Sequence, residues 1–428
     1  MKVLWVCNIM LPAIAEKLEE VYSVREGWLS GILSRFLEQE EDGSLTLGIC
    51  FPAQEKLAGF AEKLRLGKRE REIACYGFGE DLQHPEAYDP AMEHRFEEIL
   101  GDFKPDLVHI FGTEFPHAYA CAKVWNRPEK TLVGIQGLCI ACAQNYMADL
   151  PLEVADSRTL RDVLKKDSLT EQQQKFYARA EREKKLLLLT SHITGRTQFD
   201  KTTTLNINPL ASYHFMNETM RNSFYEGSWE IGKCHRYEIF VSQADYPLKG
   251  FHYLLQAMKE ILQSCPKAHI TVAGNSILGV DGIVSRIKIP AYGKYLRKLI
   301  EENRLEERIQ VLGRLNEEQM KKAYLSCHVF VCPSSVENSP NSVAEAQLLG
   351  IPVAASRAGG IPSIVEDGVS GLLFEKGDIH GLAQAVLKIF GSDAFAQELS
   401  ANERKEAARK YDGERNYRTL MAIYGELL

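Results

Sequence analysis

The stretch VFVCPSSVENSPNSVAEAQLLG, residues 329–350, carries the fold prediction. Its first four residues, 329–332, are apolar and rich in β-branched and aromatic side chains, which predicts a buried strand. A turn follows, and then Ser339 before Pro340 predicts an N-cap with proline at the first helical position. A buried strand, a polar loop and a helix in this order are typical of a parallel-sheet α/β protein.

Two glutamates flank the predicted helix start. Glu337 lies in the loop at the carboxyl end of the strand, the edge of a parallel sheet where ligands bind. The first amides of the helix, on Asn341 and Ser342, lack partners within it and favour an anion such as a diphosphate. Glu345 would then accept hydrogen bonds from a ribose, and Glu337 from a sugar. The alternative is a capped surface helix with incidental acids.

The same alternation of short apolar runs and longer amphipathic runs fills the chain. The strand candidates are VLWVC, LTLGICF, LVHIFG, TLVGIQG and HITGRT in the first half, and EIFVSQA, HITVAGN, RIQVLGR, HVFVCPS, PVAASRA and GLLFEKG in the second. This predicts the α/β class, with two Rossmann-like parallel-sheet domains facing a central cleft. We expect one domain over 1–228, a second over 229–405, and a helix over 406–428 that crosses back toward the first.

The composition bounds the possible partners. The chain has 428 residues, 45% of them hydrophobic and 25% charged, and its net charge of −7 argues against a nucleic-acid partner. The charged stretch 63–71 predicts a solvated helix or loop face. No run approaches the roughly 18 apolar residues of a membrane span. The first 14 residues lack a small-residue cleavage site, so we expect a cytoplasmic protein.

The ten cysteines are scattered, several of them within apolar runs. This pattern is typical of buried, reduced thiols. Cys139 and Cys142 have C-x-x-C spacing, but no second pair and no histidine at zinc spacing accompany them. We therefore expect neither a zinc site nor a redox site there.

The segment IPVAASRAGGIPSIVEDGVSGLLF, directly after the predicted helix, is the most specific part of the sequence. The E-x7-E spacing of Glu337 and Glu345, the G-x-P-V-x-x-S strand and the GG-x-P-x-I-V-x-D-G segment together resemble the retaining GT-B glycosyltransferases of family 4. VSQADYPLKGFHYLLQAM resembles the family's lysine-glycine loop, REGWLSG its N-terminal glycine loop, and VGIQGL the position that often holds His-Gly. The resemblance is strong over 237–378 and weaker before 190.

The resemblance implies roles for the matching residues. Glu337 would contact the hydroxyls of the donor sugar, Glu345 the ribose, and Lys249 the diphosphate as negative charge grows on the leaving group. Gln136, at the His-Gly position, is the third expected catalytic residue. The other implied nucleotide-sugar-binding residues are Gly27, Gln243, Arg314, Asn338, Ser339, Asn341 and Ser342.

Three departures from the family pattern concern the donor. Gln243 stands where many relatives have arginine, which removes a charge-assisted phosphate contact. Pro340 lacks an N–H and so cannot donate to the sugar, and Gln136 replaces a titratable histidine. A degenerate nucleotide-sugar-binding subunit and a GT-B nucleotide-sugar epimerase remain alternatives. A dehydrogenase is disfavoured, because VLWVCNIMLPAIA holds no glycine where G-x-G-x-x-G should follow.

The implied reaction moves a sugar from a UDP- or GDP-sugar to a hydroxyl with retention. No D-x-D motif occurs in the sequence, so we expect no metal and no other cofactor. The patterns GRT-x-x-D and YH-x-x-NE-x-x-R resemble a bacterial subset associated with surface polysaccharide assembly. We therefore expect a glycan or lipid-linked acceptor and transient contact with the inner face of the membrane. The acceptor-side candidates are Arg196, Thr197, His214, Asn217 and Arg221; alternatively, this polar run braces the hinge.

Overall fold

The computed structural model describes residues 1–20, 27–39, 45–275 and 288–428. The chain divides into two compact units, each described here by itself. Unit 1 comprises Met1–Ile140, Phe176–Arg221 and Lys410–Leu428, and unit 2 comprises Ala141–Lys175 and Asn222–Arg409. The chain leaves unit 1 inside α5 (Cys139–Asn145) and returns to it inside α8 (Leu169–Leu188). The boundaries predicted at 228/229 and 405/406 stay a prediction of domain organisation.

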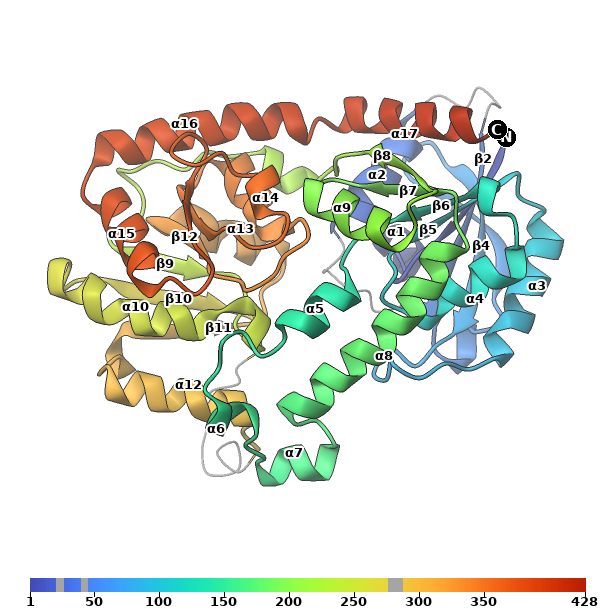
Figure 1. The fold of residues 1–428 in the computed structure, drawn as a ribbon. Coiled ribbons are helices and arrows are strands. Elements are labelled where there is room, and N and C mark those ends of the chain that lie inside the picture. The colour runs from blue at the N-terminus through green and yellow to red at the C-terminus, as the bar shows by residue number, and fades with distance from the viewer. Residues whose placement is uncertain (21–26, 40–44, 276–287) are drawn as a thin grey trace. The chain divides into compact units, whose positions relative to one another are not determined.

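Unit 1 is built on an eight-stranded sheet (Figure 1). Its strands run in the order β3 (Ala61–Leu66), β4 (Arg71–Gly79), β2 (Thr46–Ala53), β1 (Lys2–Val6), β5 (Leu107–Phe111), β6 (Thr131–Gly134), β7 (His192–Gly195) and β8 (Ser212–Phe215). Only β3 and β4 pair in an antiparallel way. At the centre, Val3 of β1 lies opposite both Leu47 and Leu107.

Helices cover both faces of this sheet, because consecutive residues of a strand point to opposite faces. The helices of unit 1 are α1 (Pro12–Lys17), α2 (Gly27–Glu38), α3 (Ala91–Phe103), α4 (Pro116–Trp125), α9 (Gln198–Ile207) and α17 (Gly413–Leu427), with short 3-10 turns at Glu55–Leu57 and Pro128–Lys130. On one face, Trp5 Nε1 donates to the hydroxyl of Tyr424 in α17 at 2.8 Å. On the other, a Cβ on Gly48 would lie 3.0 Å from Leu4 and 2.8 Å from Phe103 in α3.

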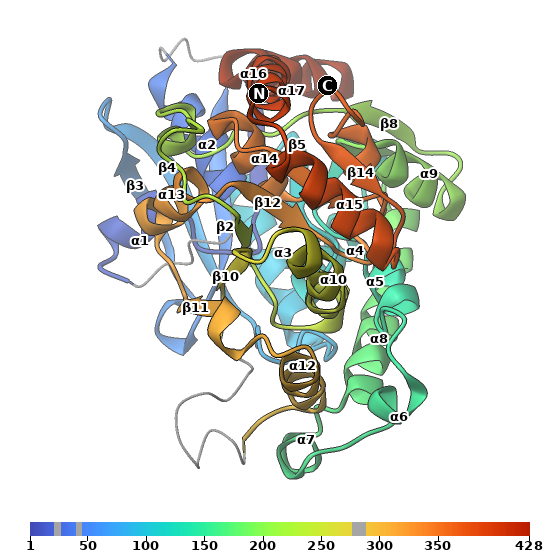
Figure 2. The same cartoon turned by 90° about the vertical axis from the view of Figure 1, so that its left-hand side faces the viewer.

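Unit 2 is built on a six-stranded, fully parallel sheet (Figure 2). The strand order is β11 (Ile309–Gly313), β10 (His269–Ala273), β9 (Glu238–Val241), β12 (Val329–Cys332), β13 (Val353–Ser356) and β14 (Leu372–Phe374). From β9 the chain proceeds toward β11, and from β12 it proceeds toward β14. The strand order therefore reverses between β9 and β12, and such a switch point opens a crevice at the carboxyl ends of the strands.

The helices of unit 2 also lie in two layers, as right-handed crossovers in opposite directions require. α10 packs against both α12 and α15, and α13 packs against α14. The bounds are α6 (Leu152–Ala155), α7 (Leu160–Lys165), α10 (Phe251–Ser264), α12 (Ala291–Glu302), α13 (Glu317–Ser326), α14 (Asn341–Leu349), α15 (Ile379–Phe390) and α16 (Asp393–Lys410), with 3-10 turns at Asn222–Tyr225, Pro247–Lys249, Glu306–Arg308 and Ile361–Ser363.

The predicted α/β class with two Rossmann-like parallel sheets is confirmed, and each predicted apolar run contains a strand. The stretch 63–71 was predicted as helix or loop, and the helix prediction is wrong. These residues form the end of β3, a turn at Gly67 with φ 72° and the start of β4. Because β3 is an edge strand with mostly exposed side chains, its charges conceal the alternation. The short strand β8 was also missed. Residues 25–26 of the predicted glycine loop lie outside the described residues.

Candidate active site

The switch point of unit 2 brings together two of the predicted catalytic residues. Lys249 follows β9 and Glu337 follows β12, and these strands are hydrogen-bonded neighbours. The ammonium Nζ of Lys249 lies 2.6 Å from Oε1 of Glu337, with side-chain exposures of 21% and 12%. Both loops leave the carboxyl edge of the sheet, so residues 88 apart in the chain meet there.

Lys249 is held in place by the backbone around it. It ends the 3-10 turn Pro247–Lys249, and the next residue, Gly250, has φ 67° in the left-handed region. The amide of Ser335, in the loop after β12, donates to the carbonyl of Leu248 at 2.8 Å. The loops after β9 and β12 are therefore joined directly by main-chain atoms.

Glu337 is fixed by both its side chain and its carbonyl. The hydroxyl of Ser334 donates to Glu337 Oε1 at 2.7 Å, so this oxygen accepts from a hydroxyl and from Lys249. The amide of Gly360 donates to the Glu337 carbonyl at 2.8 Å. The neighbouring Gly359 has φ 55°, and a Cβ there would overlap the Glu337 carbonyl oxygen. The Gly359-Gly360 turn found in the sequence thus packs against the backbone of Glu337.

The charge on Lys249 is stabilised by its neighbours. Burial disfavours the ammonium, but the Glu337 carboxylate and the Tyr246 hydroxyl outweigh it, and the pKa of Lys249 is raised above its ordinary value. A lysine with a raised pKa stays protonated at neutral pH. The site therefore presents a fixed cation next to a carboxylate.

Helix α14 begins at Asn341, with Pro340 at the N-cap and no side-chain capping bond. The predicted N-cap at Ser339 is therefore wrong by one residue, because Pro340 adopts an extended backbone with ψ 117°. Asn341 and Ser342 occupy the first helical positions, whose amides have no acceptor within the helix. Oδ1 of Asn341 is buried and has no hydrogen-bond partner among the described residues.

The remaining predicted nucleotide-sugar-binding residues of the loop after β12 and of α14 are largely shielded from solvent. Asn338 and Glu345 are buried, and Ser339 is half-buried. Glu345 lies in the second turn of α14, on the same helix start that presents the free amides. Whether these residues contact a nucleotide sugar stays a prediction.

A polar cluster that includes two of the predicted nucleotide-sugar-binding residues lies near the ends of β9, β10 and β11. Gln243 approaches Asp245 at 3.5 Å, and Asn275 Nδ2 donates to Asp245 Oδ2 at 2.9 Å. Nε of the exposed Arg314 donates to Asn275 Oδ1 at 2.5 Å. The predicted residues Gln243 and Arg314 are thus linked through Asp245 and Asn275. Sequence reasoning missed these two residues, although each lies shortly after the end of a strand.

Gln136 follows β6 in unit 1 and contacts Asn8, which follows β1, two strands away in the sheet order. Its Oε1 accepts a hydrogen bond from Nδ2 of the buried Asn8 at 2.7 Å. Glu114, which follows β5, accepts from the amide of Thr113 at 2.8 Å, and burial raises its pKa. Its position directly after the run LVHIFG could have identified it from the sequence.

Glu183 of α8 is a second buried carboxylate at this edge. It accepts from the Thr113 hydroxyl at 2.6 Å and from the amides of Cys139 and Ile140 at 3.0 and 3.2 Å. Burial raises the pKa of Glu183 to about 7, although these hydrogen bonds act in the opposite direction. No signal in the charged sequence of α8 distinguishes this glutamate from its exposed neighbours.

The acceptor-side candidates make separate contacts within unit 1. Arg196 pairs with the buried Glu218 at 3.0 Å, and Thr197 caps α9 in a capping box with Asp200. His214 lies on β8, with its Nε2 3.1 Å from Nδ1 of His192.

Arg221 lies beside Gly27 at the start of α2, and Asn217 follows β8. Asn217 is half-buried. A Cβ on Gly27 would lie 2.7 Å from Nε of Arg221, so this glycine makes room for an arginine of the same unit. These residues contact other parts of unit 1, and their contact with substrates stays a prediction.

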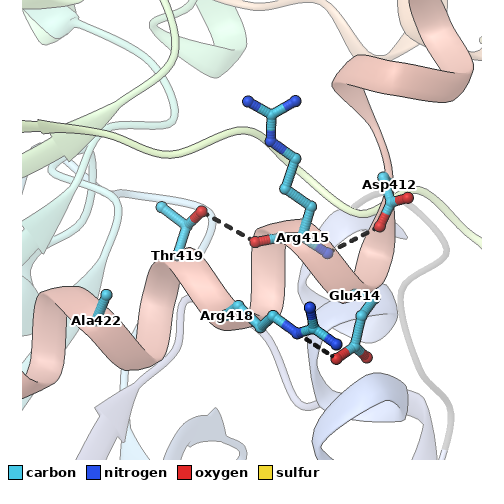
Figure 3. Close-up of a pocket in the computed structure, with 6 residues that line it drawn as sticks. All are labelled: Asp412, Glu414, Arg415, Arg418, Thr419 and Ala422. Atoms are coloured by element: carbon cyan, nitrogen blue, oxygen red, sulfur yellow. Dashed lines mark hydrogen bonds and ion pairs between the residues drawn. The ribbon is translucent and has the colours of Figure 1, made fainter.

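A surface cavity of about 440 Å³ lies along α17 (Figure 3). Its lining residues are Asp412, Glu414, Arg415, Arg418, Thr419 and Ala422. Arg418 Nε lies 2.8 Å from Glu414 Oε1, and Asp412 accepts from the Arg415 amide at 2.8 Å. None of the predicted site residues lines this cavity.

The described ranges hold no group of three or more His, Cys, Asp or Glu side chains arranged to bind a metal ion. Within the same ranges, none of the helices combines the length and apolar character of a membrane span. All ten cysteines are free, and all but Cys142 are buried.

Residues 228–406 match the family described as glycosyl transferases group 1. This segment is similar to the group 1 glycosyl transferases. It contains the whole Lys249–Glu337 site, together with Gln243, Arg314 and α14.

Similar proteins agree with this assignment. Over 166 residues the chain is 31% identical to the sulfoquinovosyl transferase of Arabidopsis thaliana, a match covering 38% of this chain and 29% of that protein. The chain spans 29% to 66% of the lengths of the first curated relatives that it matches.

Solved structures show the fold of the whole chain. Sucrose-phosphate synthase from Thermosynechococcus elongatus has a TM-score of 0.68 at 14% identity, covering 100% of this chain and 99% of that one. HepE of Anabaena, solved with UDP-glucose, has a TM-score of 0.63 at 15% identity, with 100% of both chains covered. The group 1 segment therefore lies within unit 2 of a GT-B fold.

Proposed function

We propose that this protein is a retaining, metal-independent glycosyltransferase that moves a sugar from a nucleoside diphosphate sugar to a hydroxyl. The observation that carries the proposal is the Lys249–Glu337 pair at 2.6 Å, at the switch point of the group 1 domain. The pair combines a cation for the leaving diphosphate with a carboxylate for the sugar. The start of α14 supplies amides beside it.

The proposed reaction breaks the bond between the anomeric carbon and the diphosphate oxygen and forms a bond to the acceptor oxygen. Negative charge develops on the leaving diphosphate, where the protonated Lys249 and the amides of Asn341 and Ser342 stabilise it. The departing phosphate takes the proton of the acceptor hydroxyl. Glu337 holds the hydroxyls of the sugar during this step. Lysine and helix amides take the place of a metal, in accordance with the absence of D-x-D from the sequence.

The donor is proposed to be a UDP- or GDP-sugar. HepE of Anabaena, which shares the fold, was solved with UDP-glucose, which favours UDP for this chain. The acceptor is proposed to be a glycan or lipid-linked glycan of bacterial cell-surface polysaccharide synthesis, at the cytoplasmic face of the membrane. The resemblance of the segment 195–221 to enzymes of that kind supports this acceptor class.

Calorimetric titration of the full chain with UDP, GDP, ADP and NAD, each with and without EDTA, tests the donor site. We expect one nucleoside diphosphate to bind, with an affinity that EDTA leaves unchanged. Binding of NAD alone, or of no nucleotide, would overturn the proposal. Binding of a nucleotide sugar without transfer or slow hydrolysis would instead identify a degenerate binding subunit.

A further inference from the structure

The segment 152–164 of unit 2 exposes an unusual amount of apolar surface. Leu152 is 79% exposed, Leu160 64%, Val163 57% and Leu164 75%. These four residues, here called the 152–164 patch, are a third of the twelve exposed large hydrophobic residues in the described part of the chain. Single exposed leucines are ordinary on protein surfaces, but a group of them marks an interaction site.

Helix α7 exposes its apolar face to solvent, whereas a surface helix usually buries that face against the protein core. Leu160, Val163 and Leu164 have i, i+3, i+4 spacing, which places them on one face, and that face is exposed. Asp162 is only 1% exposed, and its Oδ2 accepts from the amides of Thr159 and Ala291 at 3.0 Å each. The helix therefore turns a carboxylate toward the protein and its apolar stripe toward the solvent.

Hydrogen bonds and helix packing hold the 152–164 patch on unit 2. In both views α7 lies farther from the sheet of unit 2 than α12 does (Figures 1 and 2). Asp162 caps the start of α12 through the Ala291 amide, and α6 packs against α12. Before α6, the hydroxyl of Tyr253 donates to Ala148 O at 2.7 Å and to Asp149 Oδ2 at 2.6 Å.

The exposed charges beside the apolar stripe of α7 are positive. Lys165 and Lys166 are exposed at the end of the helix. The acids next to them are engaged with Arg161, since Nη1 lies 3.0 Å from Asp162 and Nη2 lies 3.2 Å from Asp167. The exposed acids of the segment, Glu153 and Asp156, belong to α6 and its C-cap.

We propose that the 152–164 patch inserts into the surface of an anionic lipid bilayer, with Lys165 and Lys166 at the headgroups. Leucines that enter the interface remove apolar area from water, and adjacent lysines add attraction to anionic lipid. The inserted patch lies in the plane of the membrane–water interface and does not span the bilayer. This inference does not depend on the proposed transferase activity, since binding is measured without donor or acceptor.

Flotation of the full chain with vesicles tests the proposal. We expect binding to vesicles of equal parts phosphatidylglycerol and phosphatidylcholine, and much weaker binding to phosphatidylcholine alone. The double variant Leu160→Ser/Leu164→Ser should bind anionic vesicles about tenfold more weakly or worse, because two buried leucines are lost. Lys165→Glu/Lys166→Glu should lose the preference for anionic lipid.

The control is Leu210→Ser, which removes a single leucine that is 93% exposed on unit 1. It should bind vesicles as the unaltered chain does. The proposal is overturned if the unaltered chain binds neither vesicle, or if both serine variants bind equally well. It is also overturned if light scattering shows a dimer that Leu160→Ser/Leu164→Ser converts to a monomer without changing vesicle binding, since the patch is then an interface between copies.

Discussion

A Cβ atom on Gly250 would overlap the carbonyl oxygen of Pro333, and Gly250 itself has φ 67°. This close approach joins the loop that carries Lys249 to the loop that carries Glu337.

Gly250→Ala should therefore disturb the donor site as well as stability. Both the left-handed backbone and the overlap oppose a side chain, so we expect a loss of about 1–3 kcal/mol in the free energy of unfolding. Nucleoside diphosphate affinity should fall with it. Gly232→Ala is the matched control, since a Cβ there meets nothing within 4 Å. Equal affinities for the two variants would show that the loops do not need this junction.

Substitutions of Lys249 and Glu337 should affect turnover and nucleoside diphosphate binding to different extents. Lys249→Ala removes the cation that stabilises the leaving diphosphate, and we expect kcat to fall about 100-fold or more. Glu337→Ala should abolish turnover while largely sparing nucleoside diphosphate binding. Steady-state kinetics and calorimetry on the same preparations distinguish these effects, with the exposed Glu307→Ala as control. Unchanged turnover in Glu337→Ala would refute the role given to that residue.

Glu183 should make stability depend on pH. Its pKa is about 7 in the folded chain against an ordinary value of 4.5, so the folded state binds the proton more tightly. The stability from Glu183 is complete below pH 4.5 and is lost as the pH rises through about 7. The loss amounts to about 3 kcal/mol.

Glu183→Gln should remove this loss, because glutamine does not ionise. The measurement is the difference in the free energy of unfolding between variant and unaltered chain across that pH range, which cancels other groups such as Glu114. Glu181→Gln, two residues earlier on α8 and exposed, should leave the pH profile as it is. If the free energy of unfolding changed with pH in the same way in the unaltered chain, Glu183→Gln and Glu181→Gln, the raised pKa of Glu183 would be refuted.

The buried ion pair of Arg196 and Glu218 should stabilise the fold of unit 1. Its exposures are 7% and 2%, so Arg196→Met removes a cation from beside a buried carboxylate and should cost about 3–5 kcal/mol. Adding Glu218→Leu should restore part of the loss. Hydrogen exchange of the sheet amides of unit 1 reports the change.

The exposed pair of Arg409 with Glu406 provides the comparison, and Arg409→Met should cost less than about 1 kcal/mol. If Arg196→Met kept full stability but lost acceptor use, the pair would belong to the acceptor site instead.

The sequence by itself determined the α/β class and the position of most strands. Apolar runs such as LVHIFG and VFVC are hydrophobic throughout because parallel strands are buried on both faces. It also pointed to Glu337 and α14, since polar residues after such runs lie at the carboxyl edge of a parallel sheet. Lys249 was predicted from the resemblance to the family 4 glycosyltransferases. The edge strand β3 was missed, because one solvated side and many charges conceal its period.

Only the tertiary structure decided which distant groups meet. Lys249 and Glu337 are 88 residues apart and pair because β9 and β12 are neighbours, an order that local periodicity does not contain. Glu183 is one of several glutamates in a charged helix, and only its contacts with Thr113 and Cys139 bury it. The outward apolar face of α7 likewise depends on Asp162 finding the Ala291 amide, 129 residues away. Local sequence fixes period and chemistry, whereas burial and partners arise from packing between segments that are remote in the chain.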